Sequence, residues 1–208
     1  MKKIFLLFMI LSSFACAARN QATITPEVDT SARASQKLTE EEMMKVWVEY
    51  ATPGEEHNEL NRFVGVWDNT LSVWMDPEKE PEITKGKSEI KWVMNGRHIE
   101  HTFNGTSMGE KYTGRGIIGY DKALNKYRSI WYDNMGTGMM ISTGVFEPQT
   151  NTFKDSGISS CPLQGTKEYS FVTTFTDDNN FRSEMYMQDP LSGANMRTML
   201  IEYTRAKK

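Results

Sequence analysis

The sequence predicts an all-β domain, an antiparallel up-and-down barrel of about ten strands, with one N-terminal helix packed against it. Three observations lead to this fold class. From Asn61 onward, apolar and polar residues alternate in runs that are separated by turn-forming residues such as Asn95-Gly96. No helix-length segment lies between these runs, which excludes parallel strands joined by helical crossovers. Long antiparallel strands without a helical layer bury one face by closing into a barrel.

The first 16 residues are expected to form an export signal. A basic start precedes an apolar run at 4–11, which is too short for a membrane span of about 20 residues. Two processing routes remain open. Residues 15–17 (Ala-Cys-Ala) fit a signal-peptidase site, whereas residues 13–16 (Ser-Phe-Ala-Cys) resemble a bacterial lipobox, in which Cys16 becomes the lipidated first residue. We expect export to the bacterial cell envelope, on the periplasmic side, with lipidation at Cys16.

Residues 17–38 are expected to form a flexible linker. The stretch 17–36 is polar, contains Pro26 and shows neither a helical nor a strand period, so it cannot bury enough apolar surface to order itself. A tether after a lipid anchor is one use for such a segment, and a frayed mature terminus is the alternative. Residues 39–208 are expected to form a single domain.

The composition narrows the classes of partner. The 24 basic and 27 acidic residues give a net charge of −3 without a basic block, which argues against a nucleic-acid-binding surface. Besides Cys16 the chain has only Cys161, so no disulfide is expected within the domain. The 14 methionines and 11% aromatic residues suit either an ordinary core or an adaptable apolar lining. We expect membrane contact only through the lipid anchor, and the oligomeric state stays open.

A helix is expected at about 39–50. Thr39 followed by Glu42 forms a capping box, and acidic residues fill the first turn. Apolar residues recur at helical spacing at Met43, Val46, Trp47 and Tyr50. Pro53-Gly54 then ends the helix. The apolar stripe predicts a helix that docks on the domain, and a partner-binding helix is the alternative.

The barrel is expected at about 61–205. Two turns, 120–127 and 146–153, share a pattern: an aromatic on either side, an acid at the entry, and Asn where a left-handed backbone is useful. The turn at 175–181 is similar, and the paired aromatics should meet across their strands. The expected strands are 63–75, 84–95, 97–105, 110–120, 126–133, 138–146, 152–157, 167–176, 180–188 and 196–205.

Short motifs along the chain resemble known families. Gly65-Val66-Trp67 looks like the G-x-W opening of lipocalin-like (calycin) barrels. From about Val46 to Arg205, the chain is similar to a bacterial family known as domain of unknown function 1579. This resemblance implies a lipocalin-like barrel, and it implies no activity or catalytic residue. The motifs that carry it, in order, are Tyr50 to Gly54 with His57, Phe63 to Trp67, Trp74 to Pro77, Gly96-Arg97, Phe103 to Gly105, Gly119 to Asp121, Trp131 to Asp133, Ser142 to Gly144 and Tyr203 to Arg205.

No metal site or cofactor is expected. Some lipocalin-like barrels, the nitrobindins, hold haem through a histidine late in the chain, and this sequence has no histidine after His101. His98 and His101 resemble a metal-ligand spacing. On a strand, however, a separation of three places two side chains on opposite faces, so they cannot converge on one ion.

The segment 126–133 supplies candidate pocket residues. Trp131 and Asp133 share the face opposite Arg128, whose long charged side chain belongs outside, so both should point inward. Asp133 either caps the turn that follows or is aimed into a pocket, because an unpaired buried charge is costly. His101, on one face with Phe103, is either a satisfied interior histidine or a ligand contact. The residues expected to face inward are Trp67, Leu71, Ile90, Trp92, Ile99, His101, Phe103, Trp131, Asp133 and Met185.

The sequence lacks the common catalytic motifs: G-x-S-x-G, the P-loop, and G-x-G-x-x-G on a strand-to-helix turn. Three functional hypotheses remain. The first is non-catalytic binding of a small apolar or amphiphilic molecule in the barrel. The second is an isomerase or hydrolase that uses Asp133 and His101 as acid and base. The third is a filled barrel with a structural or interaction role, which the cavity volume distinguishes from the others. The predicted ligand-binding residues are Trp92, His101, Phe103, Trp131 and Asp133.

Overall fold

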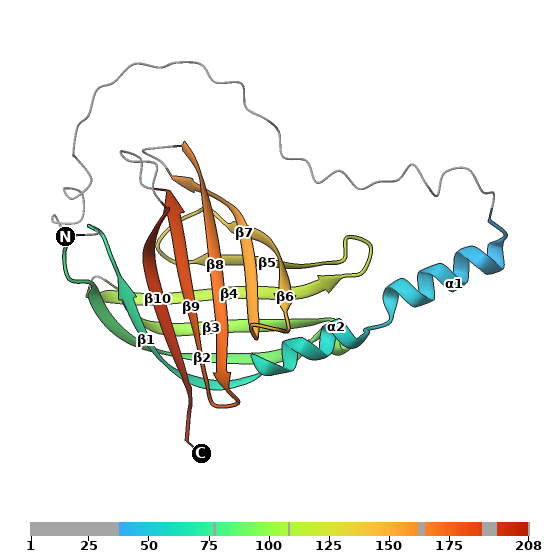
Figure 1. Ribbon diagram of the computed structural model, residues 1–208, viewed down its shortest axis with the longest axis horizontal. Coiled ribbons are helices and arrows are strands. Elements are labelled where there is room, and N and C mark those ends of the chain that lie inside the picture. The colour runs from blue at the N-terminus through green and yellow to red at the C-terminus, as the bar shows by residue number, and fades with distance from the viewer. Residues whose placement is uncertain (1–37, 77, 108, 162–164, 189–194, 208) are drawn as a thin grey trace. The chain divides into compact units, whose positions relative to one another are not determined.

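The protein folds into a closed barrel of ten antiparallel strands (Figure 1). The computed structural model describes residues 38–76, 78–107, 109–161, 165–188 and 195–207, so the predicted export signal with Cys16 and nearly all of the predicted linker lie outside the described residues. Residues Leu38–Lys208 form one compact unit. Each strand pairs with its neighbours in sequence, and the last strand pairs with the first. The predicted all-β up-and-down barrel is confirmed.

Every strand overlaps its predicted counterpart. The largest difference is at the seventh strand, which was expected to end at 157 and continues to Cys161. Gly157 marks a close approach rather than a strand end, because a Cβ there would collide with the carbonyl oxygen of Ile141. The strands are β1 (Gly65–Val73), β2 (Glu82–Val93), β3 (His98–Ser107), β4 (Glu110–Asp121), β5 (Lys126–Asp133), β6 (Met140–Glu147), β7 (Thr152–Cys161), β8 (Gly165–Asp177), β9 (Asn180–Gln188) and β10 (Asn195–Arg205).

The hairpin turns are built as their shared pattern predicts. Asn125 and Asn151 adopt left-handed backbone conformations, with φ of 51° and 53°. A short 3-10 turn, η2 (Met94–Gly96), joins β2 to β3 with Asn95 also left-handed. The aromatics that flank the turns meet across their strand pairs. Their ring centroids lie 4.9 Å apart in Tyr120–Tyr127, 4.7 Å in Phe146–Phe153 and 5.2 Å in Phe175–Phe181.

One end of the barrel is closed by a short segment that the sequence did not reveal, α2 (Glu55–Asn58) followed by η1 (Glu59–Arg62). Leu60 is fully buried there, and Phe63 packs edge-on against Phe175 and Phe181, with ring centroids 4.9 Å and 5.5 Å apart. The segment is also tied to the hairpins beside it, because the Tyr127 hydroxyl donates to the Glu56 carbonyl. This end of the barrel is therefore a solid aromatic core.

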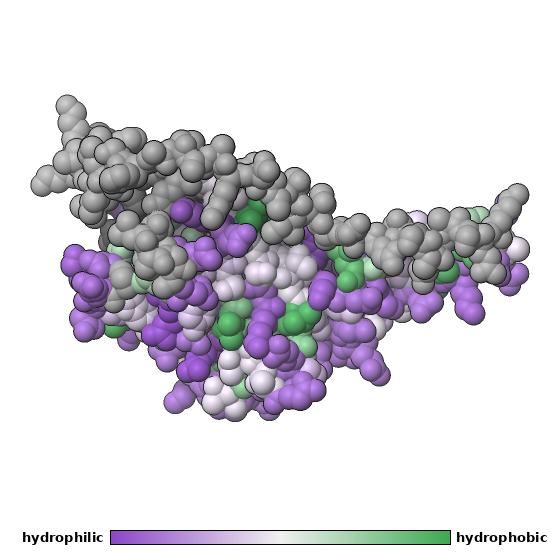
Figure 2. Space-filling model, turned by 45° about the horizontal axis from the view of Figure 1, so that its top comes forward, coloured by the Kyte–Doolittle hydropathy of each residue, from purple (hydrophilic) through white to green (hydrophobic). Residues whose placement is uncertain are grey.

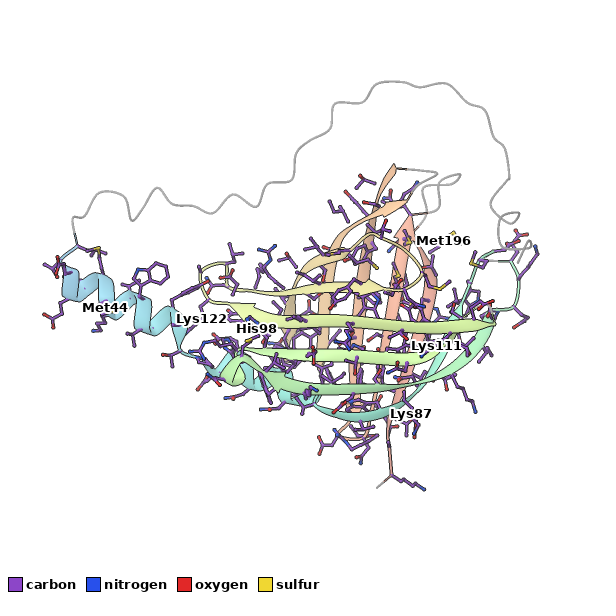
Figure 3. All side chains as sticks on the ribbon, turned by 180° about the vertical axis from the view of Figure 1, so that it is seen from behind. Met44, Lys87, His98, Lys111, Lys122 and Met196 are labelled. Atoms are coloured by element: carbon purple, nitrogen blue, oxygen red, sulfur yellow. The ribbon has the colours of Figure 1, made fainter. Side chains whose placement is uncertain are left out.

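The N-terminal helix is present as α1 (Glu40–Ala51), and its capping box is formed, since Thr39 Oγ1 accepts from the Glu42 N–H. The expected docking of its apolar stripe is not seen, because every residue of α1 is exposed. The link that remains lies at the end of the helix, where Lys122 Nζ donates to the carbonyls of Glu49 and Thr52 (Figure 3).

The outer face of the barrel is mostly hydrophilic in the view of Figure 2, with scattered hydrophobic residues. Ion pairs lie on this face, among them Lys87 with Asp68 and Lys154 with Glu147. Exposed pairs of this kind contribute about 1 kcal/mol or less each, so the fold depends on the strand ladder and the interior. Among the described helices, none is long and apolar enough to cross a membrane.

Candidate ligand-binding cavity

The half of the barrel away from α2 and η1 is hollow. It encloses a cavity of about 360 Å³, within the range of roughly 300–1,000 Å³ that is typical of small-molecule sites. Rings of the closed end, including Phe63 and Phe153, form its floor, while Val73 and Met140 lie near its mouth. Most of the wall is apolar. Apolar lining residues include Leu71, Ile90, Phe103, Ile118, Phe171, Met199 and Ile201.

Four of the five predicted binding residues lie on this wall: His101 and Phe103 on β3, and Trp131 and Asp133 on β5. The alternation of β5 is as expected, because Arg128 is exposed on the outer face. The structure thus brings these four side chains to one space. Their role in binding stays a prediction.

Trp92 lies elsewhere. Its indole N–H donates to the side-chain oxygen of Asn61 at 2.8 Å, and its ring packs against the core cluster of the closed end. It is not among the residues that line the cavity, because β2 carries it one step beyond Ile90, toward η1. Among the other residues predicted to face inward, Leu71 and Ile90 line the cavity, Trp67 and Ile99 belong to the closed-end core, and Met185 is half-buried outside the lining.

Two glycines make room for Trp131. Gly114 and Gly116 lie on β4, the strand between β3 and β5, and a Cβ at Gly114 would collide with the indole ring. The ring therefore lies against two positions of β4 that have no side chain. The indole ring also packs against His101, whose ring centroid is 5.1 Å away. Glycine at these positions determines how Trp131 is placed on the wall.

Asp133 both caps the turn that follows and lies on the cavity wall. Its Oδ1 accepts the N–H of Met135 at 2.9 Å, which is the turn-capping bond of an Asx turn. Its Oδ2 accepts the hydroxyl of Tyr112 at 3.1 Å inside the cavity. The Tyr112 oxygen in turn accepts the indole N–H of Trp131 at 3.2 Å. Burial, together with the charge of Asp133, raises the pKa of Tyr112 well above its usual value, so this tyrosine stays a hydrogen-bond donor.

His101 is held separately from Asp133. Its Nε2 lies 2.8 Å from the hydroxyl of Ser88, which is itself buried. Burial lowers the pKa of His101 to about 4, because desolvation disfavours the imidazolium form. The side chain is therefore neutral at neutral pH, a hydrogen-bonding group in an apolar wall.

A second polar group on the wall was missed from the sequence. Asp155 of β7, Tyr169 of β8, Ser142 of β6 and Ser129 of β5 all line the cavity. The hydroxyls of Ser129 and Ser142 are 2.6 Å apart, and Ser142 also hydrogen-bonds to Asp155. Alternation within the predicted strand 152–157 places Asp155 on the same face as Phe153, and this was the signal that could have found it.

The sequence matches a known protein family. The model of a family described as a protein of unknown function (DUF1579) matches residues 52–205. The chain belongs to this family. The match begins where α1 ends and covers α2, η1 and the whole barrel. The part shared with other DUF1579 members is thus the part that encloses the cavity.

Solved structures show the same fold for the DUF1579 barrel. It is similar to Rv2717c from M. tuberculosis, with 11% identity and a TM-score of 0.54 over 75% of this chain and 100% of that chain. It is also similar to the S-type phycobiliprotein lyase CPES from Guillardia theta, with 12% identity and a TM-score of 0.51 over 75% and 99% of the two chains. Both are lipocalin-like barrels. No curated protein gave a significant sequence match.

The polar chemistry of the DUF1579 cavity is that of hydrogen bonding. Within the described residues, no group of three or more His, Cys, Asp or Glu side chains converges as a metal site would require. What the wall offers is a neutral imidazole, three carboxylates and several hydroxyl groups, set among aromatic and aliphatic side chains. Such a surface can orient a molecule with an apolar body and a polar end.

Proposed function

We propose that this DUF1579 protein binds a small apolar or amphiphilic molecule inside its barrel, without catalysing a reaction. The observation that supports this proposal is the hollow half of the interior, a cavity of about 360 Å³. Small barrels either fill with side chains or hold one small molecule, and a filled barrel would leave no such volume. Apolar walls with a few placed polar groups are the usual form of a small-molecule site.

The apolar wall supplies the driving force for binding. Each methylene group that a ligand transfers from water to an apolar site contributes about 0.8 kcal/mol. Affinity should therefore rise with chain length until the cavity is full. The polar groups, which lie around Asp133 and around Asp155, would orient the ligand.

Acid–base catalysis by His101 and Asp133 has less support. Each is hydrogen-bonded to its own neighbours, Ser88 for His101 and Tyr112 with the Met135 N–H for Asp133. A histidine whose pKa is lowered to about 4 is a weak base at neutral pH. The arrangement favours binding over proton transfer.

Isothermal titration calorimetry with octanol and decanol tests the proposal. Decanol should bind saturably with one site per chain, and roughly tenfold more tightly than octanol because of its two extra methylenes. Trp131→Ala should weaken decanol binding at least tenfold. The matched control is Trp47→Ala, which removes an indole from the exposed face of α1 and should leave binding unchanged. The proposal is overturned if neither the alcohols nor a charged ten-carbon amphiphile binds saturably.

We propose further that the protein acts in the cell envelope, exported and anchored to the membrane by a lipid on Cys16. The apolar run at 4–11, the small residues before Cys16 and the polar stretch at 17–36 support this location. A barrel tethered in this way would meet amphiphilic molecules close to the membrane surface, and its own contact with the membrane would pass only through the lipid.

A further inference from the structure

Asp155 is an acidic residue in the mostly apolar wall of the cavity. It lies on β7, is half-buried, and belongs to the residues that line the cavity. Around it the wall is polar on two sides. Ser142, nearly fully buried, hydrogen-bonds to its carboxylate from β6, and Tyr169 lies near it on β8. The carboxylate is therefore built into the wall.

No cation balances this carboxylate within the described part of the chain. Asp155 takes part in none of the ion pairs there. The next residue, Lys154, is exposed and pairs with Glu147 outside the barrel, at 2.8 Å. Arg128 is likewise exposed on the outer face.

The titratable groups that share the cavity do not supply a positive charge either. Arg128 and Lys154 border the cavity, but both are exposed residues, and Lys154 pairs with Glu147. Burial keeps the imidazole of His101 neutral, and the other titratable groups of the lining are acids or phenols. These groups are Glu82, Tyr112, Tyr127, Asp133, Tyr169 and Tyr203.

The unbalanced charge has an energetic consequence. Desolvation raises the pKa of Asp155 to about 6, and the hydrogen bond from Ser142 offsets only part of this effect. The carboxylate is still mostly ionised at neutral pH. A buried negative charge without a positive partner is costly, and a cation that entered the cavity would remove that cost.

We propose that the ligand is a cationic amphiphile, an alkyl or aryl amine whose ammonium group binds Asp155 while its apolar body lies against the wall near Trp131 and Leu71. An ammonium group carries three N–H donors, and this part of the wall presents carboxylate and hydroxyl oxygens that can accept them. The inference rests on the proposed function and names the chemical class of the ligand.

The test compares three probes that share a ten-carbon chain and differ in charge: decylamine, decanol and decanoate. Calorimetry of the full-length protein at pH 7.5 should show decylamine binding at least tenfold more tightly than decanol, with decanoate the weakest. Lowering the pH to 5 should protonate about nine-tenths of Asp155 and weaken decylamine binding roughly tenfold. Decanol affinity should not change, and this comparison needs no variant.

Variants test whether the preference for decylamine over decanol depends on Asp155. Asp155→Asn should lower decylamine affinity to that of decanol while decanol binding persists. The matched control, Glu168→Gln, removes an acid from the exposed face of β8 and should preserve the preference for the amine. If Asp133→Asn abolishes the preference and Asp155→Asn does not, the ammonium group binds near the mouth and the assignment to Asp155 is overturned.

The outcomes separate this inference from the proposed function. Decanol binding as tight as decylamine binding in the unmodified protein, or a preference that survives in Asp155→Asn, overturns the amine inference alone. Failure of all three decyl probes to bind saturably overturns both.

Discussion

Asp155 and His101 face the same cavity, yet burial moves their pKa values in opposite directions, to about 6 and about 4. In both cases desolvation disfavours the charged form. The folded protein holds the Asp155 proton more tightly than the unfolded chain does, so lowering the pH from 6 to 4 stabilises the fold. The unfolded chain takes up the His101 proton first, so lowering the pH from 6.5 to 4 destabilises it. Over this window the two contributions oppose each other.

Removing the Asp155 carboxylate should show how much its buried charge contributes to the pH dependence of stability. Asp155→Asn eliminates the cost of a buried charge, so the variant should be more stable than the unmodified protein at pH 7.5, by up to about 3 kcal/mol for a shift of this size. The advantage should shrink toward zero by pH 4, where the folded protein already holds the proton. Urea unfolding at several pH values between 4 and 7.5 measures the difference.

The histidine provides the complementary control. His101→Gln keeps a hydrogen-bonding group beside Ser88 and should gain stability, relative to the unmodified protein, as the pH falls from 7 to 4. A stability difference for Asp155→Asn that does not vary with pH would show that the carboxylate is not buried in the folded protein.

For single residues, the direction of the side chain was the most predictable feature, because the two-residue period of a strand fixes it. Arg128 alone was enough to orient Trp131 and Asp133. The hydrogen bond between Asp133 and Tyr112 was not predictable, because it depends on the register in which Asp133 faces Gly114 across β4 and β5. A one-residue shift of that register would turn Tyr112 away.

The helical elements differ in how much they bury, and we expect their substitutions to differ accordingly. Leu60 in η1 is fully buried, so Leu60→Ala should lower the free energy of unfolding by about 2–5 kcal/mol. Met43 in α1 is exposed, so Met43→Ala should change it by less than about 0.5 kcal/mol. Urea unfolding of the two variants checks both values. Equal destabilisation would mean that α1 docks on the barrel, as its apolar stripe alone suggests.

Strands were easier to predict than the segment that closes the barrel, and the reason is physical. A strand repeats its pattern over many residues, and turns such as 120–127 carry their own chemistry in Asp121 and Asn125. Residues 55–62 make barely two turns of helix, too few to show a period. Their position depends on Leu60 and Phe63 reaching the aromatic rings of strands that are far away in sequence. For α1, the apolar stripe identifies a face but not what covers it.

For the whole molecule, we expect attachment to a membrane through Cys16. Intact mass spectrometry of the protein from the membrane fraction should show a diacyl- or triacyl-modified chain that begins at Cys16. Cys16→Ala should move the folded barrel to the soluble fraction of the envelope, since no other lipid attachment is expected. A soluble mature form that begins at Ala18 would contradict lipidation while leaving export intact.

The separation of the interior into a solid floor and a hollow upper half has an evolutionary consequence. The rings around Phe63 and Phe181 hold the strands together at one end, whereas residues such as Leu71 and Ser129 face open space. A substitution at the floor removes many packing contacts, but one at the hollow wall removes few, and there a larger side chain has room to fit. Proteins that descend from one ancestral barrel can therefore come to bind different ligands without losing the ability to fold. Their ligand selectivity can diverge faster than their fold.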